Sequence, residues 1–230
     1  MVRKVETLAR IPLLRGVPPA EIERLDTQCV WRRAKSGDAV LDIGDEGADL
    51  YFVAHGKLRA TIQAISGRES ILRDFGDGEF FGELAAIDGR PRSTSIVALT
   101  DAVVAKMPAQ VFLDVVHRHA SVCDGLLALL ASQIRMLANR VDEYGKLDVR
   151  GRIHAELLRL SRPDAAAPPQ GVISPPPTHA ELAARVSCRR EAVTRELNAL
   201  ARAGLIVRRR GALVLADPAT LARGVEKAQG

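Results

Sequence analysis

The chain has 230 residues, which is long enough for two modest domains that each bury a core of their own. It contains no run of about eighteen apolar residues, and Met1 to Ala9 carries charges of both signs, so the sequence predicts neither a membrane-spanning helix nor a secretory signal. We therefore expect a cytoplasmic protein that has no membrane partner.

The cysteines, Cys29, Cys123 and Cys188, are odd in number, lie far apart and lack C-x-x-C spacing. This argues against a disulfide framework, a zinc site and an iron–sulfur cluster, and we expect buried thiols.

Charge is distributed unevenly along the chain. Residues 150 to 230 hold 14 Lys and Arg against 7 Asp and Glu, while the whole chain carries a net charge of +5. A basic C-terminal domain beside a near-neutral one is the expected pattern of a nucleic-acid reader, with a merely soluble basic surface as the alternative.

Up to about Val30 the sequence predicts one or two short amphipathic helices, one of which starts near Pro18-Pro19-Ala20-Glu21. From Trp31 to Pro108, short alternating apolar runs are separated by glycine turns, which predicts an antiparallel, jelly-roll-like β-roll. The expected strands are Ala39 to Leu41, Leu50 to Val53, Leu58 to Ile62, Ser70 to Leu72 and Ile96 to Val104.

Residues 80 to 94, FFGELAAIDGRPRST, place an acid, an arginine, two hydroxyls and backbone amides on one short segment. The guanidinium of Arg92 offers a planar fork to two phosphate oxygens, and the amides of the turn from Gly82 to Ala86 add donors. Glu83 fits beside a phosphate if it accepts a hydrogen bond from a ribose 2′-OH, so the segment predicts a nucleotide site. Alternatively, the glycines only turn the barrel and Arg92 forms a surface ion pair with Glu83.

The pattern F-G-E-L-A, a spacer and P-R-S-T resembles the phosphate-binding cassette of cyclic-nucleotide-binding domains. Residues 44 to 58, GDEGADLYFVAHGKL, resemble a second signature of the same domain, in which glycines turn the corners of the barrel. The resemblance implies ligand contacts at the matching positions of the cassette, which are Gly82, Glu83, Leu84, Ala85, Arg92, Ser93 and Thr94.

Ala109 to His117 looks helical, and a longer helical pattern follows it in which apolar residues recur at alternating spacings of three and four. That spacing predicts a coiled-coil dimer seam, whereas Leu126, Leu129 and Met136 lie to its side and can pack on the barrel. Because the repeat lasts less than four heptads, a single intramolecular core is the alternative. The seam residues are Leu127, Leu130, Ile134, Leu137, Val141 and Tyr144.

Leu147 to Ile153 reads as a hinge, and a further helix is expected from Arg152 to Leu160, before Pro163. Residues 165 to 177, rich in alanine and proline, predict a loop that contributes an edge strand near Val172-Ile173.

Two short helical patterns follow, separated by Ser187-Cys188, and the first opens on a capping box of Thr178 and Glu181. Residues 204 to 215 then predict two strands about a glycine turn, so the module reads as a winged helix-turn-helix. The wing carries Arg208, Arg209 and Arg210, which suit phosphate contacts.

On the second helix of this module, Arg190, Glu191 and Arg195 can face a major groove and read G·C pairs, while a solvated charged helix is the alternative. Here the chain resembles the catabolite-activator and FNR (CRP/FNR) family of transcription regulators, which implies base reading by these three residues. The resemblance also implies a homodimer on a palindromic DNA site, with RNA polymerase as a partner if the protein is an activator. It places Thr178, Arg189 and Thr194 at the DNA as well, although Ser187 replaces the family's turn glycine and Arg189 its serine.

The resemblance does not decide whether the base of the bound nucleotide is adenine or guanine. The positions at which cAMP-responsive relatives present two hydroxyls hold Leu137 and Ala138, followed by Asn139. Leu137 can cover the base by dispersion and Asn139 can hydrogen-bond to it. Ser93 can contact the cyclic phosphate, and in cGMP-selective relatives a hydroxyl there also meets guanine. We expect cAMP first, with cGMP as the alternative.

The expected fold class is therefore α+β, with a β-roll domain at 1–118, a dimerisation helix and hinge at 119–149, and a winged helix-turn-helix at 150–230. A cupin-like metalloenzyme would need clustered ligands, whereas the histidines lie in separate elements, so no enzyme and no metal site are predicted. A haem-sensing regulator and a ligand-independent regulator remain alternatives. The histidines are His55, His117, His119, His154 and His179.

Overall fold

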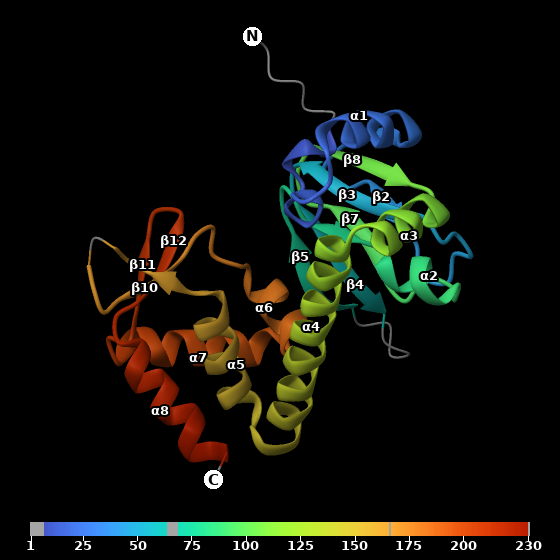
Figure 1. The fold of residues 1–230 in the computed structure, drawn as a ribbon. Helices are drawn as coiled ribbons and strands as arrows, with labels where there is room; N and C mark the ends of the chain where they lie inside the picture. The colour runs from blue at the N-terminus through green and yellow to red at the C-terminus, as the bar shows by residue number, and fades with distance from the viewer. Residues whose placement is uncertain (1–6, 64–68, 166, 230) are drawn as a thin grey trace. The chain divides into compact units, whose positions relative to one another are not determined.

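The computed structural model describes residues 7–63, 69–165 and 167–229. The chain forms two compact units, Met1–Gln133 and Ile134–Gly230, which are considered separately below (Figure 1). Most of the segment Met1 to Ala9, on which the expectation of no secretory signal rests, lies outside the described residues.

The first unit begins with two short 3-10 helices, η1 (Leu8–Arg10) and η2 (Pro12–Leu14), and the helix α1 (Pro19–Gln28). The predicted start of α1 is confirmed, since the helix begins at Pro19. A proline suits the first helical position because it has no N–H that would lack a partner there. The apolar side chains of this segment are buried in a core that also includes residues of the barrel and of the later helices.

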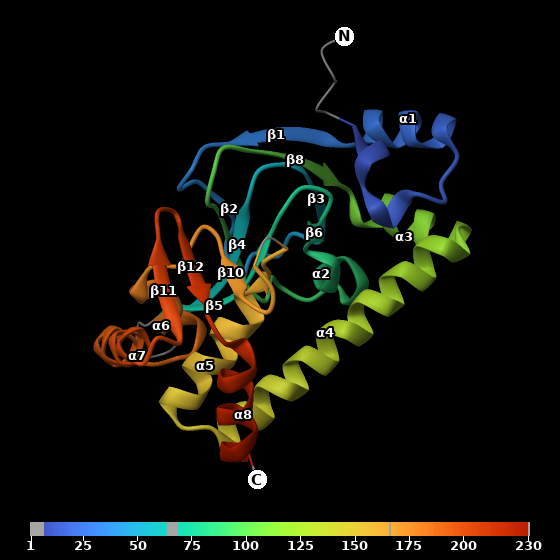
Figure 2. The ribbon, with the colours of Figure 1, turned by 90° about the vertical axis from the view of Figure 1, so that its left-hand side faces the viewer.

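The β-roll consists of two antiparallel four-stranded sheets, in the orders β1-β8-β3-β6 and β2-β7-β4-β5 (Figures 1 and 2). The prediction of a jelly-roll-like barrel is confirmed. The strands are β1 (Val30–Ala34), β2 (Ala39–Leu41), β3 (Leu50–His55), β4 (Leu58–Gln63), β5 (Glu69–Phe75), β6 (Phe80–Phe81), β7 (Ser95–Ala98) and β8 (Ala102–Met107).

The prediction of one strand from Ile96 to Val104 is wrong, because the chain turns between β7 and β8 and changes sheet there. Two polar side chains of this turn accept backbone hydrogen bonds from other loops. Thr100 Oγ1 lies 3.0 Å from the amide nitrogen of Lys57, and Asp101 Oδ1 lies 3.1 Å from that of Ser36. These bonds satisfy loop donors that a continuous strand would leave without partners.

Two helices follow the barrel, α3 (Ala109–Arg118) and α4 (Ala120–Lys146), and α4 is one continuous helix (Figure 2). Leu126 is buried in the core of the first unit and Leu129 packs against it, as the sequence predicts. Met136 is half-buried and belongs to the second unit, so its packing on the barrel stays a prediction.

By length and composition, α4 is the one helix among the described residues that is long and apolar enough to cross a membrane, with a mean hydropathy of 1.3 over an 18-residue window. A count of uninterrupted apolar residues missed this because Asp124 and Arg135 interrupt the run.

The expectation of buried thiols holds for Cys29. Its burial and the nearby charge of Asp26 raise the pKa of this thiol to about 12. Cys123 and Cys188 are only half-buried.

The second unit contains three further helices after α5 (Val149–Leu160) and one four-stranded sheet in the order β11-β12-β10-β9. Asp148 caps α5 by accepting the amide of Gly151 at 2.7 Å, so the helix starts three residues before the predicted Arg152. The remaining elements are β9 (Arg162–Pro163), β10 (Gly171–Ile173), α6 (His179–Arg185), α7 (Arg190–Arg202), β11 (Ile206–Arg209), β12 (Ala212–Leu215) and α8 (Pro218–Gln229).

The predicted strand near Val172-Ile173 exists as β10, but it is not an edge strand. It pairs with β12 on one side and with β9 on the other. Pro163 lies in β9, at the edge of the sheet, where a residue without an amide hydrogen is tolerated. β9 is only two residues long, too short to be predicted from the sequence pattern.

Candidate nucleotide site and nucleic-acid interface

Gly82 sets the geometry of the predicted cassette. It follows β6, adopts a left-handed backbone with φ of 85°, and begins the short helix α2 (Glu83–Asp88). A Cβ at this position would lie 2.7 Å from Nη1 of Arg92 and 3.0 Å from the carbonyl oxygen of Asp49. Only glycine combines this backbone conformation with so close an approach.

Arg92 is buried, with 4 % of its surface exposed. Its Nη1 donates to the carbonyl of Gly82 at 3.1 Å and its Nη2 to that of Asp49 at 2.6 Å. Among the described residues, its Nε has no hydrogen-bond partner. Burial lowers the pKa of Arg92, and nearby Tyr51 and the acidic side chains oppose that shift. The surface ion pair considered above therefore fails, and a buried cation with an unused N–H fits an anionic ligand.

Glu83 is also buried, at 8 % exposure. Burial raises the pKa of its carboxyl group, while its own backbone amide and the positive charges of Arg73 and Arg92 act in the opposite direction. Arg73 is not among the site residues predicted from the sequence. The carboxyl group of Glu83 thus lies within electrostatic range of two arginines on the same unit.

The other predicted ligand residues differ in exposure. Ala85 is buried, Leu84 and Ser93 are exposed, and Thr94 is half-buried. Leu137, Ala138 and Asn139 are exposed on the part of α4 that belongs to the second unit, and their contact with a nucleotide stays a prediction.

A haem ligand or a metal site would need suitable side chains facing inward. His55 is exposed and its Nδ1 lies 3.4 Å from a carboxylate oxygen of Asp77. In the parts of the chain that the structure describes, no group of three or more His, Cys, Asp or Glu side chains could hold a metal ion.

The predicted dimer seam forms an apolar stripe along α4. Five of its six residues are exposed, whereas Leu130 is half-buried against the core of the first unit. The exposed fractions are 58 % for Leu127, 67 % for Ile134, 53 % for Leu137, 73 % for Val141 and 40 % for Tyr144. Such a stripe on one helix is typical of an interaction surface.

The helix-turn-helix has the predicted local chemistry. Thr178 and Glu181 form the capping box at the start of α6. Val193, Leu197 and Leu200 of α7 are buried in the core of the second unit. Ser187, which replaces the family's turn glycine, takes a left-handed backbone with φ of 50°, so the turn keeps the glycine conformation rather than changing shape.

The exposed face of α7 carries the predicted base readers. Arg190, Glu191 and Arg195 are exposed, as is Arg189 at the helix cap. Thr194 is half-buried, and its hydroxyl lies 2.8 Å from Nδ1 of His179. Its hydroxyl is thus already engaged within the protein.

Arg195 also lines a shallow hollow on α7 together with Asn198 and Arg202, two residues that were not predicted from the sequence. Their helical spacing from Arg195 could have identified them. On the wing, Arg208, Arg209 and Arg210 are exposed, and Arg208 Nη2 donates to Oδ1 of Asn198 at 3.3 Å. This bond joins the wing to α7.

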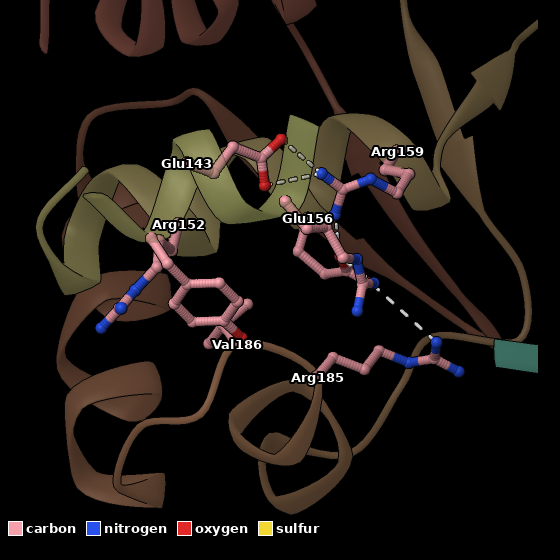
Figure 3. Close-up of a pocket in the computed structure, with 8 residues that line it drawn as sticks. Glu143, Arg152, Glu156, Arg159, Arg185 and Val186 are labelled. Carbon is pink, nitrogen blue, oxygen red and sulfur yellow. Dashed lines mark hydrogen bonds and ion pairs between the residues drawn. The ribbon is translucent and has the colours of Figure 1, made fainter. Parts of the chain in front are cut away.

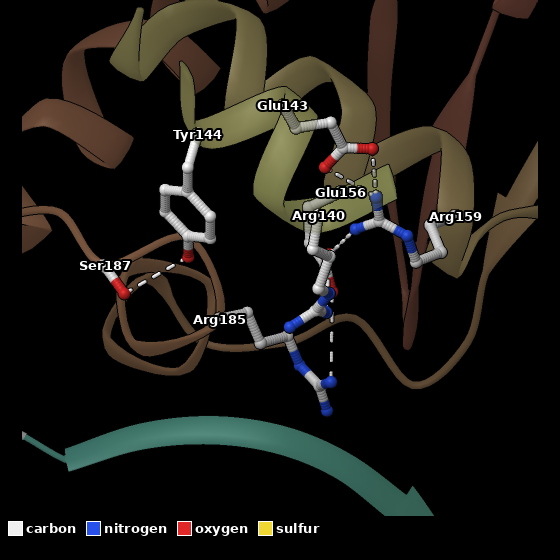
Figure 4. A network of polar contacts seen from close by, with 7 residues as sticks. All are labelled: Arg140, Glu143, Tyr144, Glu156, Arg159, Arg185 and Ser187. Carbon is white, nitrogen blue, oxygen red and sulfur yellow. Dashed lines mark hydrogen bonds and ion pairs between the residues drawn. The ribbon is translucent and has the colours of Figure 1, made fainter. Parts of the chain in front are cut away.

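A buried acid in α5 organises a polar network that the sequence did not reveal (Figures 3 and 4). Glu156 is 1 % exposed and forms an ion pair with Arg159. Its Oε2 lies 3.3 Å from Nη2 of Arg140 on α4, and its Oε1 lies 3.9 Å from Nη1 of Arg185. Glu143 of α4 accepts two further bonds from Arg159, at 2.6 and 2.8 Å. The last turns of α4 are thereby tied to α5 and to α6.

Tyr144 connects the apolar stripe to the helix-turn-helix. Its hydroxyl lies 3.2 Å from Oγ of Ser187 in the turn before α7 (Figure 4). The guanidinium of Arg152 lies 4.9 Å from the centre of its ring. One side chain of the predicted seam therefore also supports the turn that positions the recognition helix.

Each of the two units matches the model of a known domain family. The model of the cyclic nucleotide-binding domain matches residues 31–119, and the model of the Crp-like helix-turn-helix domain matches residues 151–223. A cyclic AMP receptor protein of Thermus thermophilus is 33 % identical over 195 residues, covering 85 % of this chain and 88 % of that protein. A CRP-like cAMP-activated global transcriptional regulator of Mycobacterium tuberculosis is 28 % identical and covers 95 % of this chain and 98 % of that protein.

Solved structures of similar regulators also match this chain. The catabolite activator protein of Thermus thermophilus matches with a TM-score of 0.53 at 30 % identity, covering 94 % of this chain and 99 % of that one. The c-di-GMP responsive global regulator CLP of Xanthomonas campestris matches with a TM-score of 0.65 at 27 % identity, covering 86 % and 99 %. These relatives are regulators rather than enzymes. The chain belongs to the CRP/FNR family of transcription regulators, with a cyclic nucleotide-binding domain and a DNA-binding helix-turn-helix.

Proposed function

We propose that this protein is a homodimeric, cytoplasmic transcription regulator whose binding to DNA is controlled by a cyclic nucleotide held in the β-roll. The observation that carries the proposal is Arg92, which is buried beside Glu83 and keeps an unused N–H. Arg92 would bind the cyclic phosphate and Glu83 the ribose 2′-OH.

The names of several relatives specify cAMP, which makes cAMP the first candidate effector. The exposed hydroxyl of Ser93 and the absence of hydroxyls at Leu137 and Ala138 make cGMP the second. One structural relative is described as c-di-GMP responsive, so cyclic dinucleotides belong in the same test. A haem-sensing or ligand-independent regulator is the competing function, and the exposed position of His55 weighs against haem ligation through that side chain.

The exposed stripe on α4 supports dimerisation, because burying its side chains against a second copy would remove apolar surface from water. A twofold dimer would present two copies of α7 to two half-sites about one helical turn apart, so we expect a palindromic DNA site. If the protein activates transcription, RNA polymerase is a further partner.

Calorimetric titration of nucleotide-free protein with cAMP, cGMP and c-di-GMP tests the effector directly. We expect saturable binding of a cyclic mononucleotide with one molecule per chain. An absorption spectrum of the same preparation separates the competing function, since a Soret band together with no nucleotide binding would overturn the proposal.

The purine contact can be tested by restoring the missing hydroxyls. Leu137→Thr combined with Ala138→Ser should shift the ratio of dissociation constants in favour of cAMP, because the new hydroxyls can hydrogen-bond the adenine edge. Competition binding with both nucleotides measures the ratio. An unchanged ratio would place these positions away from the base.

Nucleotide binding should also depend on pH through Glu83. A carboxylate accepts the 2′-OH hydrogen bond, and burial raises the pKa of this group, so affinity should fall as pH decreases from neutral through that raised pKa. Glu83→Gln should bind more weakly at neutral pH but show no such pH dependence. A parent protein whose affinity is flat over this range would refute the ribose contact.

The raised pKa of Glu83 also affects the stability of the fold. A carboxyl group whose pKa is raised by folding binds its proton more tightly in the folded protein, so the free energy of unfolding should fall as pH rises through that pKa. Glu83→Gln should therefore unfold at a higher temperature than the nucleotide-free parent at neutral pH. Thermal melting of both proteins at two pH values measures the difference.

Base readers and phosphate anchors should respond differently to substitution. Replacing Arg190, Glu191 or Arg195 by Ala should cost about 1–3 kcal/mol on the preferred site and relax sequence choice at one symmetric pair of positions. Replacing Arg209 or Arg210 should instead weaken binding to all duplexes and make the salt dependence shallower. Fluorescence anisotropy on specific and random duplexes at several salt concentrations distinguishes these outcomes. A wing variant that changes sequence preference but keeps its salt slope would reverse the assignment.

A further inference from the structure

The last turns of α4, the helix α5 and the end of α6 meet at a junction that has two levels of contact (Figures 3 and 4). At the first level, Oε2 of Glu156 on α5 lies 3.3 Å from Nη2 of Arg140 on α4. Oε1 of Glu156 lies 3.9 Å from Nη1 of Arg185, the last residue of α6. The proposed function gives no role to any of these three residues.

The second level of the junction is built around the ring of Tyr144 on α4. The Tyr144 hydroxyl lies 3.2 Å from Oγ of Ser187, two residues after Arg185. The guanidinium of Arg152 on α5 lies over the same ring, 4.9 Å from its centre. Each level therefore joins one side chain of α4 and one of α5 to α6 or to the turn that follows it.

Helical spacing aligns the two levels. Arg140 and Tyr144 lie four residues apart on α4, and Arg152 and Glu156 lie four residues apart on α5, so each pair occupies one face of its helix. Contacts at two points along a helix restrict its rotation as well as its sliding, which a single contact would not do. The turn that is held in this way leads directly into α7, which begins at Arg190.

Glu156 is the carboxylate that the arginines of the first level share. It is 1 % exposed, and the side chains of Arg140 and Arg185 are 14 % and 7 % exposed. Burial alone would lower the pKa of Arg159, which also pairs with Glu156, but the charges of Glu156 and Glu143 raise it overall. Removing one member of a buried ion pair leaves an uncompensated charge. Without the carboxylate of Glu156, buried guanidinium groups from different helices would therefore repel one another.

The same part of α4 carries the predicted dimer seam. Leu137 and Val141 of the seam are exposed, and Tyr144 belongs both to the seam and to the second level of the junction. In a twofold dimer, the angle between α4 and the helix-turn-helix sets the distance between the two copies of α7. Adding or removing one base pair between two half-sites changes their separation by about 3.4 Å and their relative rotation by about 34°.

We infer that Glu156 is a positioning residue, which through Arg140 and Arg185 holds the helix-turn-helix at a fixed angle to α4 and thereby limits the dimer to one spacing of DNA half-sites. A dimer with a loose junction would accept several spacings, because each helix-turn-helix could adjust its angle to reach its half-site. The inference rests on the proposed function, since it assumes a dimer through the seam that binds a palindromic site.

Glu156→Gln tests this role, because glutamine keeps the size of the side chain but removes its negative charge. Fluorescence anisotropy, with both cAMP and cGMP present, compares a palindrome that the parent selects from random duplexes with versions one base pair longer or shorter between the half-sites. In the parent this change should weaken binding at least about tenfold, because a rigid dimer cannot then engage both half-sites. In Glu156→Gln it should cost less than about threefold. Affinity for a duplex with a single half-site should stay at the parent's value.

Asp142→Asn provides the matched control. Asp142 also lies on α4, but its side chain is 51 % exposed and pairs with Lys146 of the same helix at 2.9 Å. The substitution removes the same charge as Glu156→Gln and leaves the junction intact. We expect this variant to keep the parent's preference for one spacing.

A Glu156→Gln protein that keeps the parent's spacing preference would overturn the inference. Equal losses on palindromes and on single half-sites would overturn it as well, because they would indicate a role in stability alone. Thermal melting identifies a variant that fails to fold, and Arg140→Gln, which breaks the first level from the side of α4, then replaces it with the same expected result. A parent that is monomeric or binds no palindrome would refute the proposed function, whereas a dimeric parent whose spacing preference is insensitive to these substitutions would refute only this inference.

Discussion

Arg92→Ala should lower the affinity for a cyclic nucleotide by about 2–5 kcal/mol, which is the typical cost of removing one partner from a buried, hydrogen-bonded charge pair. The guanidinium is held by the carbonyl oxygens of Gly82 and Asp49 and is almost completely buried. A phosphate bound there would lose its charged donor in a place that water reaches poorly. Titration calorimetry with cAMP and cGMP measures the loss.

Arg90→Ala is the control for this experiment. Arg90 lies two residues away, and its side chain is 84 % exposed and pairs only with Asp88 at the surface, at 3.8 Å, among the described residues. Its replacement should leave nucleotide affinity unchanged. Equal binding by the parent and Arg92→Ala would contradict the assignment of the phosphate site, and equal losses in both variants would point to a nonspecific charge effect.

Replacing Ile134 and Val141 by Asp should convert the protein to a monomer. These two residues are 67 % and 73 % exposed, so the substitutions add no buried charge within one chain, but they would bury four unpaired carboxylates in a symmetric seam. A monomer can engage only one half-site at a time, and loss of the second contact should reduce DNA affinity about 10²–10⁴-fold.

Light scattering after size-exclusion chromatography measures the oligomeric state, and anisotropy on a palindromic duplex measures DNA binding. Ser132→Asp is the matched control, because Ser132 is exposed on α4 but does not belong to the stripe. It should remain dimeric. A double variant that remains a dimer with parental DNA affinity would show that the stripe is not the dimer interface.

Residues that act through local chemistry were predictable from the sequence. The capping box at Thr178 and Glu181 depends on two side chains three positions apart, and the helix start at Pro19 depends on a missing amide hydrogen. The acid and arginine of the cassette were identified together because they lie nine residues apart in the chain. Short-range rules suffice for such features.

Features that depend on distant segments were missed. The sequence of β10 predicts an edge strand, because the two residues of β9 that pair with it cannot be recognised from the sequence alone. Arg73 looks like an ordinary strand residue until the register with β4 and the ring of Phe75 place it on the inner face. Glu156 resembles a solvated helix residue, yet three arginines from three helices surround it.

The central claim is that a nucleotide in the β-roll controls the affinity for DNA, which requires the ligand to bind the DNA-competent dimer better than the resting one. Fluorescence anisotropy on one palindromic duplex, with and without saturating cyclic nucleotide, tests this most directly. We predict that the nucleotide tightens DNA binding at least about tenfold in the parent, equivalent to about 1.4 kcal/mol of coupling, and has no effect in Arg92→Ala. Identical DNA affinity with and without nucleotide, in a parent that calorimetry has shown to be saturated, would contradict the account.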